Sequence, residues 1–170
     1  MSINFIYHDF AGARLRLAAT VCVMMSVMLG TGCATGSGPA ARQESISDEL
    51  RDQAAAIASF QIGAPYRYRS NGPETFDCSG LVQYSYARLG LALPRSTSEL
   101  RNAVERVRRA SLARGDLVFF NEGRRRASHV GIYLGDDWFV HAPSSGKPVR
   151  IDRLGSPHWT QSYAFGGRVR

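Results

Sequence analysis

The order of the hydrophobic patterns predicts an α+β domain, in which N-terminal helices pack on one antiparallel β-sheet of about five or six strands. Helical spacing dominates the first half of the 170-residue chain, and the compact or alternating apolar runs typical of strands begin after Gly115. The turns between those runs are short, which requires neighbouring strands to be antiparallel. Helices followed by strands, rather than alternating with them, indicate a sheet with helices against it.

Residues 1–33 have the pattern of an export signal rather than of the domain. Two arginines precede an apolar run, Leu17–Leu29, that is short for a membrane span and fits the core of a signal peptide. Small residues then lead to Cys33, so the segment resembles a bacterial lipoprotein signal, in which this cysteine is lipidated. Gly30 stands where such signals usually have leucine, and ordinary cleavage or an uncleaved anchor remain alternatives.

The segment 34–45 is small and polar, and we expect it to be a flexible tether before a domain at 46–170. Ala34 would follow a lipidated cysteine directly. In lipoproteins of double-membraned bacteria aspartate at this place commonly favours the inner membrane, so alanine favours the outer one. The domain is therefore expected in the cell envelope, anchored to the outer membrane and facing the periplasm.

The formal net charge is +7, and arginine supplies nearly all of the positive side chains because Lys147 is the only lysine. Arginine suits contact with carboxylates and phosphates. An anionic wall polymer, an anionic membrane and nucleic acid all fit this charge. The aromatic residues are spread as core residues and do not form the stacking platform that single-stranded nucleic acid requires, so we expect no nucleic-acid partner.

Within the domain, the first helix is expected from Glu49 to Gln61, because Pro65 forbids its continuation. A second helix is expected to begin at Cys78, after a cluster of turn formers. Ser96 and Glu99 have the spacing of a capping box and predict a third, short helix. Strands are expected at Asp116–Phe120, His129–Leu134, Trp138–Ala142 and Val149–Leu154, with another starting at Tyr163 and a polar turn at Asn121–Ala127.

Cys78 is the only cysteine left in the domain once Cys22 and Cys33 are assigned to the leader and the anchor. An exported domain with one cysteine has no internal disulfide. A lone cysteine is more often a small buried hydrophobe than a nucleophile. The first turn of a helix, however, has unpaired N–H groups and a positive dipole end, which favour a thiolate.

Two histidines supply what a cysteine nucleophile requires, a base and a group that orients the base. His129 heads one expected strand and His141 lies near the end of the next. Since the start of one strand faces the end of the other in an antiparallel hairpin, we expect the two imidazoles to be neighbours. A helix that starts at Cys78 and packs against this edge of the sheet would complete a Cys-His-His line.

Six short motifs follow one another along the domain. They are Ala64–Tyr68, Phe76–Leu81, Leu93–Thr97, Gly115–Phe120, Ser128–Gly135 and Phe139–Ala142. Together and in this order they resemble the motifs of the NlpC-type cell-wall cysteine peptidases, a papain-like group. The resemblance covers the chain from about residue 50 to its end.

The resemblance implies a role for each site residue. Cys78 would be the nucleophile, His129 the general base and then acid, and His141 the residue that orients His129. Backbone N–H groups at the start of the helix would also serve the oxyanion. The residues expected to bind substrate or the oxyanion are Tyr66, Asp77 and Ser79.

The same resemblance implies a peptidoglycan endopeptidase that hydrolyses amide bonds in stem peptides or cross-links, without a cofactor. Its partners would be the stem peptides and a membrane that holds the lipid anchor. Three alternatives stay open. They are an inactive wall-binding lipoprotein on the same fold, an N-acetylmuramoyl-L-alanine amidase, and a zinc site made by Cys78, His129 and His141.

Overall fold

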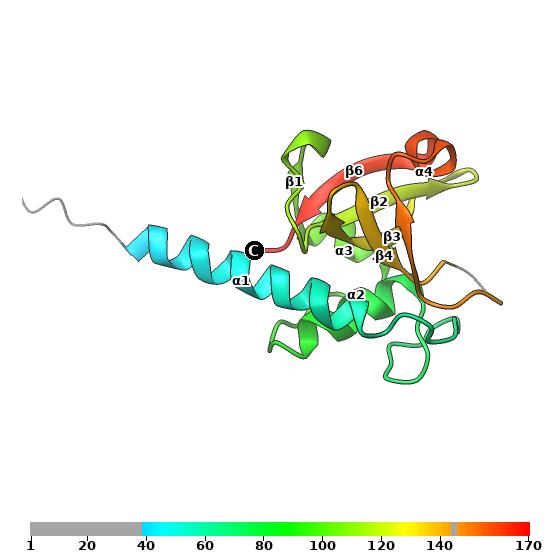
Figure 1. Cartoon of the computed structure of the whole chain (residues 1–170), viewed down its shortest axis with the longest axis horizontal. Coiled ribbons are helices and arrows are strands. Elements are labelled where there is room, and N and C mark those ends of the chain that lie inside the picture. Colours follow the sequence, from blue (N-terminus) through cyan, green and yellow to red (C-terminus); the bar gives the residue numbers. More distant parts are fainter. Residues whose placement is uncertain (1–38, 144–145) are drawn as a thin grey trace, which may run out of the picture. The chain divides into compact units, whose positions relative to one another are not determined.

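A computed structural model describes residues 39–143 and 146–170, with side chains from residue 48 onward. The expected signal segment, Cys33 and the first part of the tether lie outside these residues. No helix within the described part of the chain is long and apolar enough to span a bilayer. The elements, shown in Figure 1, are α1 (Pro39–Ser59), α2 (Cys78–Ala87), α3 (Thr97–Ala103), β1 (Glu105–Val107), the 3-10 turn η1 (Arg109–Ser111), β2 (Leu117–Glu122), β3 (Arg125–Gly135), β4 (Trp138–His141), β5 (Arg150–Arg153), α4 (Pro157–Ser162) and β6 (Tyr163–Arg168).

The strands form one six-stranded sheet in the order β1-β6-β2-β3-β4-β5. Every neighbouring pair is antiparallel. Three of the strands, β2, β3 and β4, follow one another directly in the chain, as the short turns predicted. Helices α1, α2 and α3 all contact β3, so the N-terminal helices cover the sheet at its centre (Figure 1). The predicted α+β class and the predicted antiparallel sheet are therefore confirmed.

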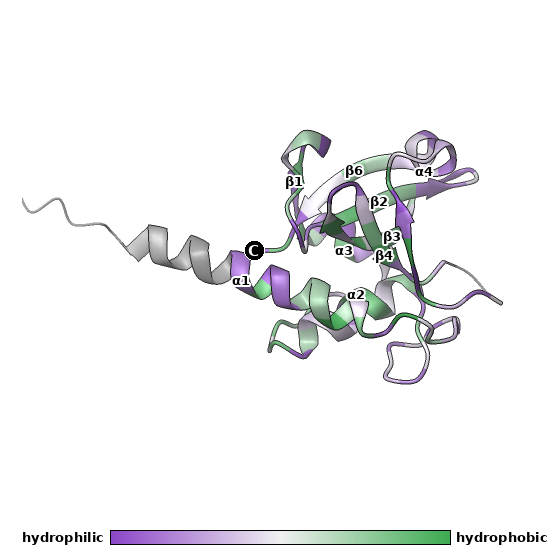
Figure 2. Ribbon diagram, in the orientation of Figure 1, coloured by the Kyte–Doolittle hydropathy of each residue, from purple (hydrophilic) through white to green (hydrophobic). Residues whose placement is uncertain are grey.

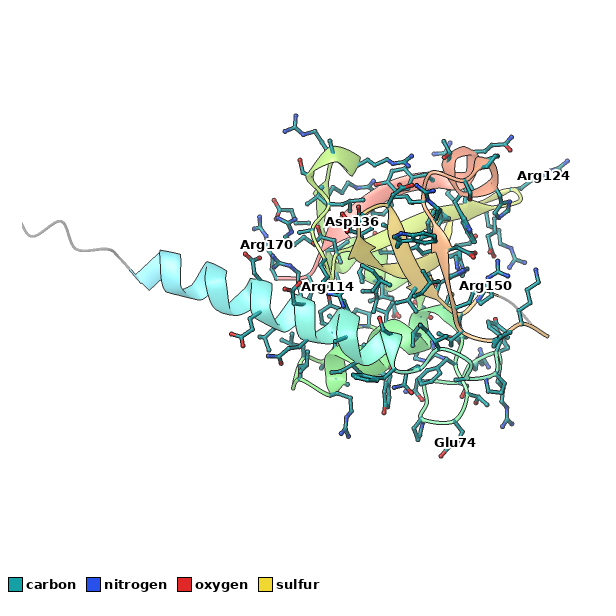
Figure 3. The ribbon with its side chains drawn as sticks, viewed as in Figure 1. Glu74, Arg114, Arg124, Asp136, Arg150 and Arg170 are labelled. Carbon is teal, nitrogen blue, oxygen red and sulfur yellow. The ribbon has the colours of Figure 1, made fainter. Side chains whose placement is uncertain are left out.

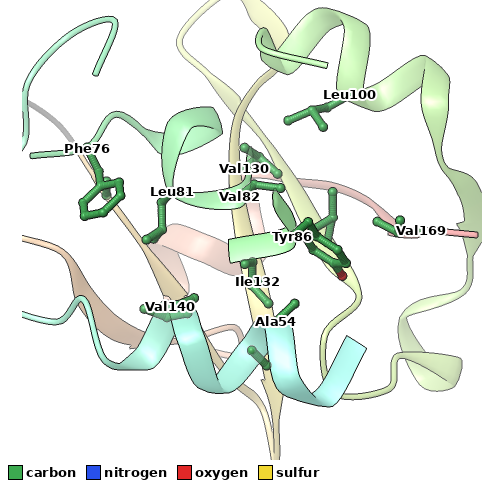
Figure 4. Packing of buried hydrophobic residues seen from close by; sticks show 14 of the residues in the cluster. Ala54, Phe76, Leu81, Val82, Tyr86, Leu100, Val130, Ile132, Val140 and Val169 are labelled. Carbon is green, nitrogen blue, oxygen red and sulfur yellow. The ribbon is translucent and has the colours of Figure 1, made fainter. Parts of the chain in front are cut away.

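Both faces of the sheet are covered, and β2 explains why. Leu117 and Phe119 belong to the hydrophobic cluster under the helices, whereas Val118 and Phe120 belong to a smaller cluster on the opposite face with Trp159 of α4. Successive side chains of a strand point to opposite faces, so a continuous apolar run is buried on both sides. The larger cluster, shown in Figure 4, joins side chains of α1 and α2 to those of β3 and β4, among them Ala54, Leu81, Val82, Tyr86, Val130, Ile132 and Val140.

Helix α1 differs from its prediction at both ends. It begins at Pro39 rather than at Glu49, so its first turns pass through the second part of the expected tether, and it ends at Ser59. Proline is favoured in the first turn of a helix, and the alanine, arginine, glutamine and glutamate that follow are good helix formers, so small polar composition was a poor guide here. Its buried face is centred on Ala54, Ala55 and Ala58, and Figure 2 shows the hydrophobic colour increasing toward this end of the helix.

The first hairpin is tighter than expected. The polar segment Asn121–Ala127 was predicted to be a turn, but β2 continues to Glu122 and β3 starts at Arg125. The paired residues Glu122 and Arg125 extend the hairpin beyond the apolar core, where exposed polar side chains are compatible with strand pairing. His129 consequently lies within β3 rather than at its start. Helix α4 was not predicted, because its six residues give too short a pattern.

The start of α2 agrees with the prediction and depends on a close backbone contact. Asp77 precedes the helix as its N-cap, and its carboxylate accepts a hydrogen bond from the Gly80 N–H at 2.7 Å. Gly80 itself lies directly against the Ser70 carbonyl oxygen, and a Cβ built on Gly80 would overlap that oxygen. Only glycine therefore allows the loop before α2 to pass this close to the turn that carries Cys78.

We expect Gly80→Ala to lower the free energy of unfolding by at least about 2 kcal/mol, because the new methyl group displaces backbone rather than a flexible side chain. Gly90→Ala is the matched control. Gly90 has a φ of +80° and no atom within 4 Å of a built Cβ, so only backbone strain acts there, at a cost of about 1 kcal/mol. Chemical denaturation of both variants measures the difference, and equal losses would contradict the overlap with Ser70.

Candidate active site

Cys78 is the first residue of α2 and is partly buried. Its Sγ lies 3.7 Å from the Thr97 Oγ1 at the start of α3. Burial raises the pKa of the Cys78 thiol and the nearby Asp77 charge adds to this, whereas the Thr97 hydroxyl and the backbone N–H groups of Val130 and Ser79 act in the opposite direction. The helix start alone predicted a lowered pKa. In the folded protein burial has the largest effect, and the pKa lies above its usual value.

Asp77 and Ser79, on either side of the cysteine, are engaged in a network within the protein. Besides capping α2, Asp77 accepts from the Arg69 backbone N–H at 2.8 Å and from the Arg95 guanidinium at 2.6 Å. The Ser79 hydroxyl accepts from the same guanidinium at 3.0 Å. Arg95, which the sequence analysis did not single out, thus ties the loop before α3 to the start of α2. The expected contact of Asp77 and Ser79 with substrate stays a prediction.

The two histidines are neighbours, as expected. The His129 Nε2 and the His141 Nδ1 are 2.8 Å apart, and both side chains are almost completely buried. They lie on the sheet face that carries α4, where Trp159 packs against both rings. Gly131 lies between them on this face, and a Cβ there would fall 2.7 Å from the Phe139 ring and 3.2 Å from the His141 Cβ. The glycine therefore allows the close approach of β4, whose Phe139 ring, Val140 carbonyl oxygen and His141 Cβ lie against it.

Asp152 of β5, which was not among the predicted site residues, continues this line beyond His141. Its Oδ2 lies 3.0 Å from the His141 Nε2, and it also accepts from Arg150 at 2.7 Å and from the Trp159 indole at 2.9 Å. The sequence pattern that could have indicated Asp152 is the alternation in the expected strand Val149–Leu154, which puts Arg150 and Asp152 on one face of the sheet. The register of β4 with β5, which pairs Phe139 with Asp152, decided that this face is the one with the histidines.

The carboxylate of Asp152 fixes the direction of every hydrogen bond in this relay, which we define as His129, His141 and Asp152. Burial raises the pKa of Asp152, but the hydrogen bonds from Arg150 and Trp159 and the contact with His141 outweigh burial, and the pKa lies below its usual value. An ionised carboxylate only accepts, so the His141 Nε2 carries the proton and its Nδ1 accepts. The His129 Nε2 then donates, which leaves the lone pair of neutral His129 on Nδ1.

Both imidazoles are neutral at neutral pH. Burial, reinforced by the neighbouring His141, lowers the pKa of His129 well below its usual value. Burial lowers the pKa of His141 to about 4, although the Asp152 carboxylate acts in the opposite direction. The upward direction for the Cys78 thiol and the downward direction for the two imidazoles both favour neutral groups over a thiolate–imidazolium pair.

A cavity of about 1070 Å³ joins the parts of the site. Its lining brings together Cys78, His129, Tyr66, Asp77 and Ser79, while His141 lies behind His129. Burial raises the pKa of the Tyr66 phenol, and the nearby Asp77 charge raises it further, so the hydroxyl is a neutral donor in the cavity that holds the thiol. At the start of α2, the Leu81 N–H donates the first hydrogen bond within the helix. The N–H groups of Cys78 and Ser79 precede it and therefore have no acceptor within the helix.

The zinc alternative finds no support in this geometry. Among the residues that the structure describes, no three metal-ligating side chains gather at one point. The His129 and His141 nitrogens that face each other are hydrogen-bonded, so they do not converge with Cys78 on a shared position. The chemistry of the arrangement is that of an acid–base relay behind a thiol.

Comparison with known proteins agrees with this chemistry. The model of the NlpC/P60 family matches residues 63–168. The murein DD-endopeptidase MepH of Escherichia coli is 43% identical over 115 residues, which cover 64% of this chain and 42% of MepH. The bifunctional muramidase/DL-endopeptidase CwlT of Bacillus subtilis is 38% identical over 112 residues, which cover 64% of this chain and 33% of CwlT. The chain thus spans less than half of the length of these relatives.

A solved structure gives the same result for the fold. An NLP/P60 family protein from Staphylococcus aureus, described as similar to a lipoprotein, superposes with a TM-score of 0.65 at 32% identity. The match covers 72% of this chain and 42% of that protein. The papain-like architecture expected from the sequence is therefore confirmed.

The buried neutral histidines predict a specific pH dependence of stability. The pKa of His141 is about 4 in the folded protein and 6.5 in a model peptide, so the unfolded chain takes up the proton first as the pH falls. The free energy of unfolding is fully present above pH 6.5 and falls by about 3 kcal/mol toward pH 4 from His141, with His129 adding in the same direction.

Chemical denaturation at several pH values measures this slope. His141→Asn is expected to flatten it. His158→Asn removes an exposed histidine whose charge makes only the smallest contribution to lowering the two buried pKa values, and it is expected to change the slope far less. A His141→Asn protein that keeps the full slope would show that the loss of stability at low pH has another origin.

Proposed function

The chain belongs to the NlpC/P60 family, and we propose that it is a peptidoglycan endopeptidase that hydrolyses amide bonds in stem peptides or their cross-links with the Cys78 thiol. Family membership supports the reaction class, and the names of MepH and CwlT support the substrate class. The observation that carries the proposal is the relay of His129, His141 and Asp152 behind a cavity that holds Cys78.

In the proposed first step, the His129 Nδ1 takes the thiol proton while the Cys78 Sγ attacks the carbonyl carbon of the scissile amide. The carbonyl oxygen becomes an oxyanion, for which the Cys78 and Ser79 N–H groups and the Tyr66 hydroxyl are the available donors. The imidazolium that forms on His129 donates through Nε2 to His141, and the Asp152 charge stabilises it across the relay.

In the second step, the tetrahedral intermediate collapses and the C–N bond breaks. The leaving amine takes the proton from the His129 Nδ1, and the acyl group stays on Cys78 as a thioester. Water then attacks the thioester with neutral His129 as the base, which releases the acid product and restores the thiol. Because both partners start neutral, the thiolate arises only as substrate is attacked.

We also propose that residues 1–33 are an export signal, that Cys33 carries lipid, and that the segment 34–45 links this anchor to the peptidase domain at 46–170. The apolar run Leu17–Leu29 and the small residues before Cys33 support the proposal. One solved relative is described as similar to a lipoprotein. The outer membrane, with the domain facing the periplasm, is the proposed location.

Cys78→Ala is expected to abolish hydrolysis of a defined set of purified muropeptides, with a loss of about 10⁴-fold or more, because no other thiol is available in the domain. Mass spectrometry of the products measures the loss and identifies the bond that the native protein cuts. The thermal midpoint of the variant is the control for folding. Turnover that survives in folded Cys78→Ala protein would exclude the thiol mechanism, and muropeptide binding by native protein without turnover would identify a wall-binding lipoprotein.

Asp152→Asn tests the outer end of the relay. The Asp152 charge raises the pKa of both histidines, so its loss lowers these pKa values and is expected to move the acid limb of the kcat/KM profile to lower pH. We expect kcat to fall by about 10²-fold with little change in KM. Asp136→Asn makes the same change on an exposed turn and serves as the control. A lower thermal stability with an unmoved acid limb would reduce Asp152 to a structural residue.

A further inference from the structure

The β2–β3 hairpin carries a run of arginines that the proposed reaction does not use. Arg124, Arg125 and Arg126 follow one another there, and all three are exposed. Figure 3 shows the Arg124 side chain projecting outward from the hairpin. A fourth arginine, Arg101 of α3, reaches the same hairpin, because its guanidinium donates to the Arg126 carbonyl oxygen at 3.4 Å. We define these four arginines as the hairpin cluster.

The hairpin cluster has an excess of positive charge. Glu122, the partner of Arg125 across the hairpin, offsets one of the four charges. Glu99, which is also on α3, is engaged at the start of its own helix, where it accepts from the Ser96 hydroxyl at 2.6 Å. No ion pair in the part of the chain described with side chains includes an arginine of the cluster. Guanidinium groups without a carboxylate partner are available to bind anions from outside.

The cluster begins at the rim of the active-site cavity and continues away from it. Arg125 and Arg126 line that cavity together with the thiol, whereas Arg101 and Arg124 do not line it. A ligand that fits within the cavity therefore meets only the first two arginines. A larger ligand that extends over this rim also reaches the other two, so the cluster can distinguish a polymer from its soluble fragments.

Three kinds of polyanion fit this charge, and the position of the hairpin favours one of them. Figure 1 shows the hairpin on the side of the domain away from the start of α1. In the proposed anchoring the chain reaches the membrane through α1, so the hairpin faces away from the lipid headgroups. None of the exposed large hydrophobic side chains that the structure describes lies on the hairpin, which therefore offers no aromatic ring on which nucleic-acid bases could stack. The cell-wall polymer, which repeats carboxylates along its stem peptides, is the remaining partner.

We propose that the hairpin cluster is a second binding surface for the cell-wall polymer, which holds carboxylates of the network outside the cavity while one stem peptide occupies the cavity. This inference rests on the proposed endopeptidase function and goes beyond it, because the surface takes no part in the cleavage. Each exposed ion pair contributes modestly, but several pairs formed with one polymer act together. The surface therefore raises activity on the intact wall and not on small fragments.

Binding is tested with Cys78→Ala protein, so that the proposed nucleophile cannot digest the polymer. The protein is sedimented with purified sacculi, with and without the further changes Arg101→Ala and Arg124→Ala. We expect the two arginine changes to weaken binding roughly tenfold. Higher salt, or amidation of the carboxylates of the sacculi, is expected to weaken binding of the protein that keeps both arginines.

Arg88→Ala/Arg108→Ala is the matched control, because it removes two exposed positive charges that lie outside the cluster and do not line the cavity. Arg101→Lys/Arg124→Lys keeps the charge and is expected to retain most of the binding, and thermal midpoints verify that all variants fold. Binding that is unchanged in Arg101→Ala/Arg124→Ala, or that falls equally in the control, overturns the inference.

Activity separates this surface from the catalytic site. In protein that keeps Cys78, Arg101→Ala/Arg124→Ala is expected to slow hydrolysis of sacculi roughly tenfold and to leave kcat/KM for soluble muropeptides within about twofold of the native value. An equal loss on both substrates overturns the inference. Native protein that hydrolyses neither substrate overturns the endopeptidase proposal instead, and sedimentation with sacculi then still decides whether the surface binds the wall.

A membrane role is tested with vesicles of phosphatidylglycerol and of neutral phosphatidylcholine. The difference in binding between the two is expected to be the same for native protein and for Arg101→Ala/Arg124→Ala. A difference that disappears in the variant, while binding to sacculi stays unchanged, would assign the cluster to an anionic membrane and overturn the inference.

Discussion

The Asp152 carboxylate determines which imidazole donates the hydrogen bond between His129 and His141. It thereby determines which nitrogens of the site carry protons. A pair of neutral imidazoles in contact has two equivalent arrangements of their protons, because either ring can donate. An ionised carboxylate at one end removes this symmetry. With Asp152 bound to the His141 Nε2, the His129 Nε2 carries a proton and the His129 Nδ1 does not. Hydrogen bonds from Arg150 of β5 and Trp159 of α4 keep the carboxylate ionised. These two elements therefore keep the His129 Nδ1 unprotonated, as a base for the cysteine on α2.

A separate hydrogen-bond network, which is also centred on an aspartate paired with an arginine, positions the Cys78 nucleophile. Asp77 caps α2 through one oxygen and binds Arg95 through both, and Gly80 allows the helix to start against the preceding loop. The thiol and the base thus belong to different layers of the domain, the thiol to the helical layer and the base to the sheet. Their meeting depends on the hydrophobic cluster that joins these layers, in which Leu81 and Val82 of α2 pack with Val130 of β3.

The features that the sequence predicted correctly depend on local patterns. The start of α2 follows from turn formers before Cys78, and the closeness of His129 and His141 follows from the short antiparallel hairpin that joins their strands. Asp152 and Arg95 could not be predicted, because their contacts depend on the register of β4 with β5 and on the path of a loop. The raised pKa of Cys78 was missed for a related reason. The helix start is a local feature, but burial is a tertiary one, and burial had the larger effect.

The raised pKa of the Cys78 thiol has a consequence for the durability of the protein. Peroxides and other oxidants attack the thiolate far faster than the thiol, and the first product, a sulfenic acid, leads on to irreversible forms. At the proposed location outside the cytoplasm, where the cytosolic systems do not keep thiols reduced, a permanently ionised cysteine would be exposed to oxidation. In the proposed mechanism, a thiol with a raised pKa that stays partly buried until substrate binds is protected between turnovers.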